Sequence, residues 1–354
     1  MNMKNNIINK FTYLYLYVII KMEDKVEEKN KFIKPLIISI LIVLLIIGGY
    51  FTYNKLTSKK PDEKKDTEVV SKITPLLYEV TKSGSNNKMY LFGSIHAAMP
   101  SDLVYPEYVL NAYNNSHYIA CEANIYSYQQ DIDAQMELAL KLRYMDGTTI
   151  KDHLNSETYN KIVNFLNEKG AYTEAYDYYV PYYMYSLVNQ FMANDAKLNS
   201  NSGVDINILR KATEDKKTII EIESLNYQLD IFLGLSDELY DIMFTELLDN
   251  YDDNVKALTG LYNAWKTGNE RQLILYSGDE IKESDSYTKE QLAEIRNFND
   301  TLLKNRNNTM TQKAIEYFNN NQDVFFMVGT LHIVGGNGLV KQLENNGFTV
   351  KQVK

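Results

Sequence analysis

Two of the four histidines in this 354-residue chain occur in the same local pattern. His96 ends the segment YLFGSIH, residues 90–96, and His332 ends FFMVGTLH, residues 325–332, so each apolar run closes with Gly-x-x-His. The glycine permits a backbone turn or a close approach that a side chain would block. If the two strands lie side by side, both imidazoles converge at the rim of one sheet, where α/β folds place their sites.

Two glutamates end apolar runs in a similar way and could complete such a site. Glu122 lies in YIACEANI, residues 118–125, where an unpaired buried carboxylate would be costly. Glu223 comes at the end of TIIEIES, residues 218–224. Imidazoles that meet a carboxylate form either a metal site or a general-base pair. The alternative for Glu122 is a strand-end side chain that faces water.

The other histidines and the single cysteine indicate structural roles. His117 precedes a strand and His153 lies in the polar helix start TIKDHLN, so both are expected at the surface. Cys121 neighbours Glu122 but is expected on the opposite side of the strand, as a small core residue. Asp205, in GVDINILRK, is expected to cap the N-terminus of a helix.

The composition excludes several classes of protein. The net charge of −9, with Lys and Asp or Glu interspersed, provides no basic surface for nucleic acid. A single cysteine forms no intramolecular disulfide and does not build a cysteine zinc site. With 45% hydrophobic residues, the chain is able to bury one large core or two lobes that share one. We therefore expect no nucleic-acid partner and a fold held by packing.

The N-terminal part has the composition of a membrane anchor. Residues 35–53 are uncharged and largely apolar, close to the about 20 residues that cross a bilayer. A cleaved signal peptide is the alternative, but no small-x-small cleavage pattern follows. Residues 1–34 would form a cytoplasmic tail, shorter if translation starts at Met22, and the polar residues 54–72 a flexible linker. We expect a single-pass protein of the cell membrane with its domain outside the cytoplasm.

The pattern over residues 73–354 predicts an α/β domain. Apolar runs near both ends predict strands, and LLYEVTK and KMYLFGSI, separated by SGSNN, predict a β-hairpin. Between the strands, apolar residues at helical spacing predict a large helical insertion at about 127–200 and 236–318. We expect a sheet-based core with two related Gly-x-x-His halves, preceded by one transmembrane helix.

In order and spacing, these motifs resemble those of the TraB/GumN family, which includes pheromone-shutdown proteins and the TIKI proteases. The resemblance covers roughly residues 74–354 and rests on YLFGSIHAAMPSDLVYP, IACEANI, GVDINILRKATEDKKTIIEIESLNYQLDIF, LSDELYDIM, NRNNTM and VGTLHIVGGNGLVKQLENNGFTV. It implies an α/β fold with two related sheet halves around a helical insertion, distantly similar to erythromycin esterases and ChaN-like proteins. In the TIKI members, the two motif histidines and a glutamate are associated with divalent-metal-dependent peptide hydrolysis.

Carried over by position, the resemblance indicates six catalytic candidates, of which the first three would bind a divalent metal ion (Mn, Co or Zn): His96, Glu122, His332, Glu223, Arg306 and Asn307. Two imidazoles and one carboxylate leave a fourth coordination position for water. Glu223 could then accept a proton. Arg306 could hold a substrate carboxylate or stabilise charge in the transition state, and its alternative is a helix-surface side chain paired with an acidic neighbour.

The resemblance thus implies a membrane-anchored, metal-dependent hydrolase, a peptidase that acts on an extracytoplasmic peptide or protein. Two other functions stay open from the residues. One is a metal-free hydrolase in which His96 or His332 is the general base toward an ester. The other is a membrane-anchored protein that binds a peptide signal in the same cleft without cleaving it.

Overall fold

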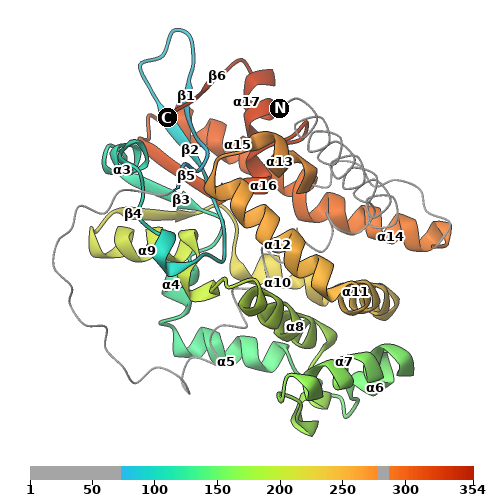
Figure 1. The fold of residues 1–354 in the computed structure, drawn as a ribbon. Helices are drawn as coiled ribbons and strands as arrows, with labels where there is room; N and C mark the ends of the chain where they lie inside the picture. The colour runs from blue at the N-terminus through green and yellow to red at the C-terminus, as the bar shows by residue number, and fades with distance from the viewer. Residues whose placement is uncertain (1–72, 277–286) are drawn as a thin grey trace, which may run out of the picture.

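The computed structural model describes residues 73–276 and 287–354. The expected tail (1–34), membrane anchor (35–53) and linker (54–72) lie outside these residues. None of the helices in the described residues is both long enough and apolar enough to cross a bilayer. The described chain is built around one β-sheet with helices packed against it (Figure 1).

The sheet has six strands in the order β4-β3-β5-β2-β1-β6. The neighbours β4, β3, β5 and β2 are parallel, whereas β1 is antiparallel to both β2 and β6. The expected β-hairpin is present as β1 and β2, and the α/β class is confirmed. The strands are β1 (Leu77–Thr81), β2 (Met89–Ser94), β3 (Tyr118–Cys121), β4 (Thr218–Glu221), β5 (Val324–Gly329) and β6 (Thr349–Gln352).

The position of β5 in the sheet explains its composition. Every residue of VFFMVG is buried, as expected for a parallel strand that is covered on both faces. Exposed residues alternate with half-buried ones in the edge strand β6. In the β2–β5 pair, Gly93 lies opposite Val328 and Ser94 opposite Gly329. The two Gly-x-x-His segments therefore leave the sheet side by side, at the same edge.

Several helices pack directly against the strands. α9 contacts β3 and β4, α15 contacts β5, α16 contacts β2 and β5, and α17 contacts β6. α14 continues into α15 through a π-helical segment, Asp300–Asn305. The bounds of this group and its neighbours are α3 (Glu107–Asn114), α9 (Val204–Glu214), α13 (Glu270–Tyr276), α14 (Lys289–Asn299), α15 (Arg306–Asn319), α16 (Thr330–Ile333) and α17 (Leu339–Asn345).

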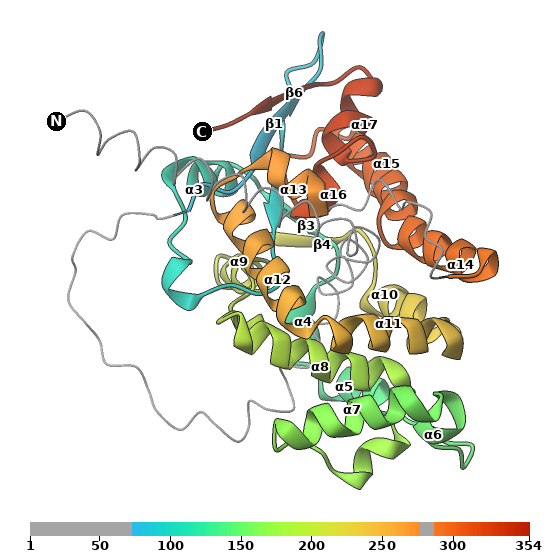
Figure 2. The ribbon, with the colours of Figure 1, turned by 45° about the vertical axis from the view of Figure 1, so that its right-hand side comes forward.

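The other helices form the inserted part of the chain. Helices α5 to α8 lie together at the end of the molecule away from β1 and β6 (Figures 1 and 2). The second helical run begins before residue 236, because Ser224 accepts a hydrogen bond from the Tyr227 backbone N–H and caps α10. The helices are α4 (Ile125–Tyr128), α5 (Ile132–Lys141), α6 (Ile150–His153), α7 (Ser156–Glu168), α8 (Pro181–Asp195), α10 (Leu225–Leu233), α11 (Asp237–Asp249) and α12 (Tyr251–Lys266).

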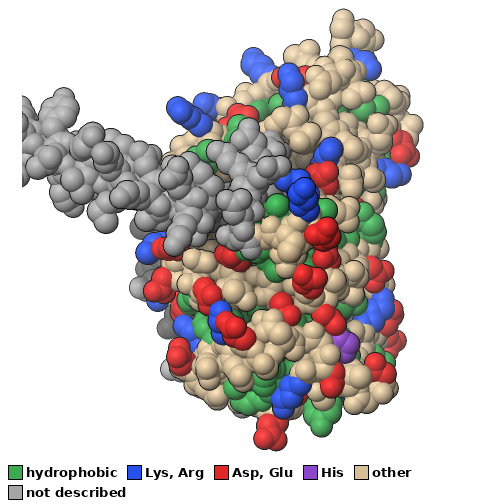
Figure 3. Space-filling view, turned by 90° about the vertical axis from the view of Figure 1, so that its right-hand side faces the viewer, with side chains coloured by type: hydrophobic (Ala, Val, Ile, Leu, Met, Phe, Trp, Pro, Cys, Tyr) green, Lys and Arg blue, Asp and Glu red, His purple; other side chains and the backbone are tan. Residues whose placement is uncertain are grey.

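Charged side chains of both signs are interspersed on the face drawn in Figure 3. Charged side chains of the described residues often form short-range pairs on helices, such as Lys161 with Glu157 at 3.4 Å and Lys211 with Asp215 at 2.8 Å. Exposed pairs of this kind contribute little to stability, typically about 0–1 kcal/mol each. The fold therefore depends mainly on its apolar core.

Gly93 lies where β2 meets α16 and α12. A Cβ atom at this position would be 2.7 Å from Thr330 Oγ1 and 3.1 Å from Thr330 Cβ. The Gly93 carbonyl accepts a hydrogen bond of 2.9 Å from the indole N–H of Trp265, so the strand cannot shift away without losing that bond. Packing therefore requires glycine in the first motif.

Replacing Gly93 by alanine should lower the free energy of unfolding by about 1–3 kcal/mol, because the added methyl group overpacks against Thr330. Urea denaturation measures the change. Gly336→Ala is the matched control, since a Cβ atom there meets nothing within 4 Å. If Gly93→Ala were as stable as the control, the close contact with Thr330 would not explain why position 93 is glycine.

Candidate functional site

The four parallel strands each deliver one candidate residue at the carboxyl edge of the sheet. His96 follows β2 by two residues, Glu122 follows β3 directly, and Glu223 follows β4 by two residues. His332 lies in the single-turn helix α16 after β5. Carboxyl ends of parallel strands are where α/β folds bind ligands. The arrangement brings together residues that are up to 236 positions apart, from 96 to 332.

Arg306 joins the two glutamates. Its Nε atom donates to both carboxylate oxygens of Glu223 at 3.0 Å, and Nη2 donates to Glu223 Oε2 at 2.8 Å and Glu122 Oε2 at 2.5 Å. Nη1 donates to the Leu302 carbonyl at 3.1 Å, within the π-helical segment. The Arg306 side chain is 2% exposed. A buried guanidinium shared by two carboxylates is a paired charge, and removing either partner would be costly.

Glu122 is held at both oxygens. Oε1 accepts the Gly329 backbone N–H at 2.6 Å, and Oε2 accepts from Arg306 and, at 3.2 Å, from Gln228 Nε2. The same Gln228 amide donates to Glu223 Oε2 at 3.1 Å. Burial alone would raise the pKa of Glu122, but the Arg306 charge, followed by the imidazoles and the Gly329 N–H, lowers it to about 2. Glu122 is therefore ionised at neutral pH, and the alternative of a strand end facing water is wrong.

Asn307 fixes the orientation of His332. The Nδ1 atom of His332 lies 2.5 Å from Asn307 Oδ1, while Asn307 Nδ2 donates to the Asn337 carbonyl at 2.9 Å. Because an amide oxygen only accepts, Nδ1 carries the proton and Nε2 keeps its lone pair. Burial first, and then the Arg306 charge, lowers the pKa of His332 to about 3. This Nε2 atom lies 3.9 Å from Glu122 Oε1.

Asp205 holds His96, a role that the sequence analysis missed. Its carboxylate bonds to His96 Nδ1, whereas the residue that caps α9 is Gly203, so the expected N-cap assignment of Asp205 is wrong. Burial would lower the pKa of His96, but the charge and hydrogen bond of Asp205 outweigh it and raise the pKa. A Cβ atom on Gly203 would be 2.5 Å from the His96 carbonyl oxygen, so glycine allows α9 to start against the histidine.

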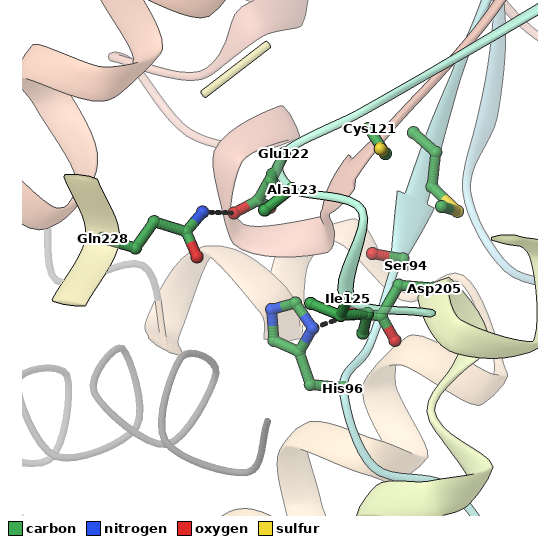
Figure 4. Close-up of a pocket in the computed structure, with 9 residues that line it drawn as sticks. Ser94, His96, Cys121, Glu122, Ala123, Ile125, Asp205 and Gln228 are labelled. Carbon is green, nitrogen blue, oxygen red and sulfur yellow. Dashed lines mark hydrogen bonds and ion pairs between the residues drawn. The ribbon is translucent and has the colours of Figure 1, made fainter. Parts of the chain in front are cut away.

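The Nε2 atom of His96 is buried and has no hydrogen-bond partner among the described residues. It faces a cavity beside Glu122 and Gln228 (Figure 4). The space open to a water-sized sphere in this cavity is about 10 Å³. This space has room for about one water or one small ion beside His96 Nε2.

The donor atoms fit a divalent metal ion in their chemistry. Each imidazole has its Nδ1 held by an oxygen, which is how metal-binding histidines are commonly oriented. If both imidazoles are neutral, the carboxylates of Glu122, Glu223 and Asp205 contribute a charge of −3 and the guanidinium of Arg306 a charge of +1. A divalent cation would balance the net charge of −2. Among residues 73–276 and 287–354, no group of three or more His, Cys, Asp or Glu side chains is already arranged to hold a metal. Metal binding would therefore require the side chains of His96, Glu122 and His332 to move from the positions that they have in this structure.

The remaining singled-out side chains lie elsewhere or play structural parts. His117 is 81% exposed at its side chain and pairs with Asp323, as expected of a surface residue. The half-buried His153 stacks on Tyr144 and bonds to Asp237. Cys121 is 2% exposed, as expected of a core residue, but it also lines the cavity that Glu122 lines, instead of lying apart from the site.

The fold and site define an α/β protein with a buried histidine–carboxylate cluster at the carboxyl edge of a mainly parallel sheet. A model of the TraB/PrgY/gumN family matches residues 76–352, and the chain belongs to this family. No curated protein and no solved structure gave a significant match.

The low pKa of Glu122 predicts a loss of stability in acid. Its carboxyl has an ordinary pKa of 4.5 and a folded-state pKa of about 2, so its ionisation stabilises the fold by on the order of 3 kcal/mol above pH 4.5. This contribution should decline as the pH falls from 4.5 towards 2.

Urea unfolding of metal-free protein between pH 7 and pH 3 tests this expectation. The difference in free energy of unfolding between wild type and Glu122→Gln should be largest near pH 7 and shrink below pH 4.5. Glu157→Gln, a side chain that is 81% exposed, is the control and should change stability by less than about 0.5 kcal/mol. A difference for Glu122→Gln that stays constant over the whole range would contradict the ion pairing of Glu122.

Proposed function

We propose that the protein is a hydrolase whose site binds one divalent metal ion, Mn²⁺, Co²⁺ or Zn²⁺. The ligands would be His96 Nε2, His332 Nε2 and an oxygen of Glu122. The supporting observation is the buried His96 Nε2, which faces the cavity beside Glu122 without a partner among the described residues while Asp205 holds its other nitrogen. Buried polar atoms are nearly always hydrogen-bonded or ligated, so this atom is a candidate for a metal ion or a bound water.

The residues around the cavity prepare these ligands. A bound metal would polarise a scissile carbonyl and lower the pKa of a coordinated water. Asp205 keeps His96 Nε2 directed at the cavity, whereas Asn307 orients His332 so that its Nε2 lies 3.9 Å from Glu122 Oε1. Gln228 also bonds to the Glu122 carboxylate. Arg306 keeps Glu122 ionised, which a carboxylate ligand requires.

The geometry supports positioning roles for Arg306 and Glu223. The Arg306 donors bind Glu122, Glu223 and the Leu302 carbonyl, so they are already engaged within the protein. Glu223 receives hydrogen bonds from Arg306 on both oxygens and a further one from Gln228. We propose that Arg306 and Glu223 hold Glu122 in position for the metal ion. They would then neither bind a substrate carboxylate nor accept a proton.

We propose a peptide or protein substrate outside the cytoplasm, with the domain tethered to the cell membrane by residues 35–53. Membership in the TraB/PrgY/gumN family supports this proposal through the TIKI resemblance. A substrate would lie across the mouth of the cavity, because the cavity itself has room only for the metal ion.

A metal-free hydrolase is the second candidate, and the His96–Asp205 pair favours it. A histidine bonded to a carboxylate through Nδ1 and free at Nε2 has the arrangement of a general base. In this case His96 Nε2 would take a proton from water in the cavity. Hydrolysis that resists chelators and is lost in Asp205→Ala would support this second function.

Metal analysis of the purified protein separates the two candidates. We expect one metal ion per chain in the wild type and none in His96→Ala, His332→Ala or Glu122→Gln, and double variants hardly less active than single ones, because the residues act as one site. Metal at about 100 times its Kd should stabilise the wild type by about 2.7 kcal/mol and leave the three variants unchanged. His153→Ala, a partly exposed histidine outside the site, is the control and should bind metal normally. Equal stabilisation of His332→Ala and wild type would remove His332 from the site.

Protease treatment of intact protoplasts tests the proposed topology. If residues 35–53 anchor a domain outside the cytoplasm, added protease should degrade residues 73–354 while a cytoplasmic marker protein stays intact. Full protection of the domain until the membrane is permeabilised would show the opposite orientation.

A further inference from the structure

Exposed apolar side chains gather on and around α5. Three large hydrophobic side chains on this helix are exposed over more than a third of their surface: Ile132 (70%), Met136 (62%) and Leu140 (59%). They are spaced four residues apart. No residue of α5 is fully buried. A stripe at i, i+4 and i+8 lies along one face of a helix, and here this face is turned to solvent.

Three further exposed side chains adjoin this helix. Met145 follows it along the chain, and the backbone N–H of Tyr144 bonds to the Tyr178 carbonyl at 3.0 Å. Lys141 Nζ bonds to Asn226 Oδ1 at 3.1 Å, next to Tyr227. We define the α5 patch as the six exposed side chains that these contacts connect: Ile132, Met136, Leu140, Met145, Tyr178 and Tyr227.

The α5 patch borders the candidate site. The short helix α4 leads into α5, and its first residue, Ile125, lines the cavity that contains His96 and Glu122. On the other side, Tyr227 precedes Gln228, which bonds to Glu122. Exposed large apolar side chains that gather in one region commonly mark binding surfaces.

The charged residues beside the exposed apolar row of α5 indicate which kind of partner binds there. Asp133 and Glu137 lie four residues apart beside the apolar row, and both are exposed. Lys141 is already engaged by Glu137 at 3.4 Å and by Asn226. In an antiparallel pairing of two α5 helices centred on Met136, Glu137 of one copy would face Glu137 of the other, which disfavours a second copy. An anionic lipid surface is disfavoured for the same reason.

We propose that the α5 patch binds an apolar segment of the polypeptide substrate that is flanked by Lys or Arg residues. The apolar side chains of that segment cover Met136 and Leu140, and its basic residues pair with Asp133 and Glu137. The bound segment holds the neighbouring part of the substrate at the mouth of the cavity. This inference rests on the proposed function only in calling the bound peptide a substrate. The preference of the α5 patch for one peptide over another can be measured without catalysis.

Fluorescence anisotropy with the purified full chain tests the preference. The probes are two labelled synthetic peptides with the same apolar core, one flanked by lysines and the other by glutamates. The lysine peptide should bind at least about tenfold more tightly than the glutamate peptide, and the double variant Met136→Ser/Leu140→Ser should weaken its binding by about tenfold. Glu137→Lys should reduce the preference for the lysine peptide. Leu275→Ser removes a side chain that is 72% exposed on α13 and should leave binding unchanged.

The outcomes separate this inference from the proposed function. His332→Ala should lose any cleavage of the lysine peptide but bind it as the wild type does. If the wild type binds the peptide without cleaving it, the hydrolase proposal fails while the docking surface stands. Wild-type affinity in the double variant, or equal losses in Leu275→Ser, would overturn the docking surface. The peptide-docking inference would also be overturned if the double variant kept its peptide binding but no longer formed a dimer that the wild type forms. Loss of binding to anionic vesicles with peptide binding retained would have the same meaning.

Discussion

The buried guanidinium of Arg306 is the interaction on which the candidate site depends. It joins the ends of β3 and β4 through Glu122 and Glu223, and it ties both to the start of α15. A charge this deeply buried is tolerated only when it is paired and hydrogen-bonded, so the guanidinium and the two carboxylates must be placed together. The same field keeps Glu122 ionised and His332 neutral, which is the combination of charge states that metal ligands need.

The imidazoles are fixed by a second set of partners that lie on separate helices. Asp205 at the start of α9 holds His96, and Asn307 at the start of α15 holds His332. The segments that follow β2, β3 and β5 thus supply His96, Glu122 and His332, while helix starts orient the two imidazoles. Strands β2, β3 and β5 are largely buried, and a packed framework of this kind is what a precisely oriented small-ion site requires. The α5 patch, in contrast, contains none of these site residues, so the proposed binding there would leave His96, Glu122 and His332 in place.

Sequence patterns predicted the parts of the site that local chemistry determines. Two apolar runs that end in Gly-x-x-His indicated adjacent strands, and a glutamate at the end of another buried run indicated a paired carboxylate. Both expectations agree with the positions of His96, His332 and Glu122. The roles of Asp205 and Gln228 were missed, because an aspartate at a helix start reads as a cap and a glutamine in a helix gives no signal. Their partners are more than 100 residues away in the chain, and only the strand order β4-β3-β5-β2 brings them together.

Anomalous X-ray diffraction from crystals of the purified protein soaked in MnCl₂, recorded near the manganese edge, tests the account most directly. The account predicts one strong anomalous peak within about 2.0–2.3 Å of His96 Nε2, His332 Nε2 and a Glu122 oxygen. Arg306 should still bind Glu223 in that crystal. A peak at another place, or no peak while the Arg306 ion pairs are intact, would contradict the claim that this buried cluster is a metal site.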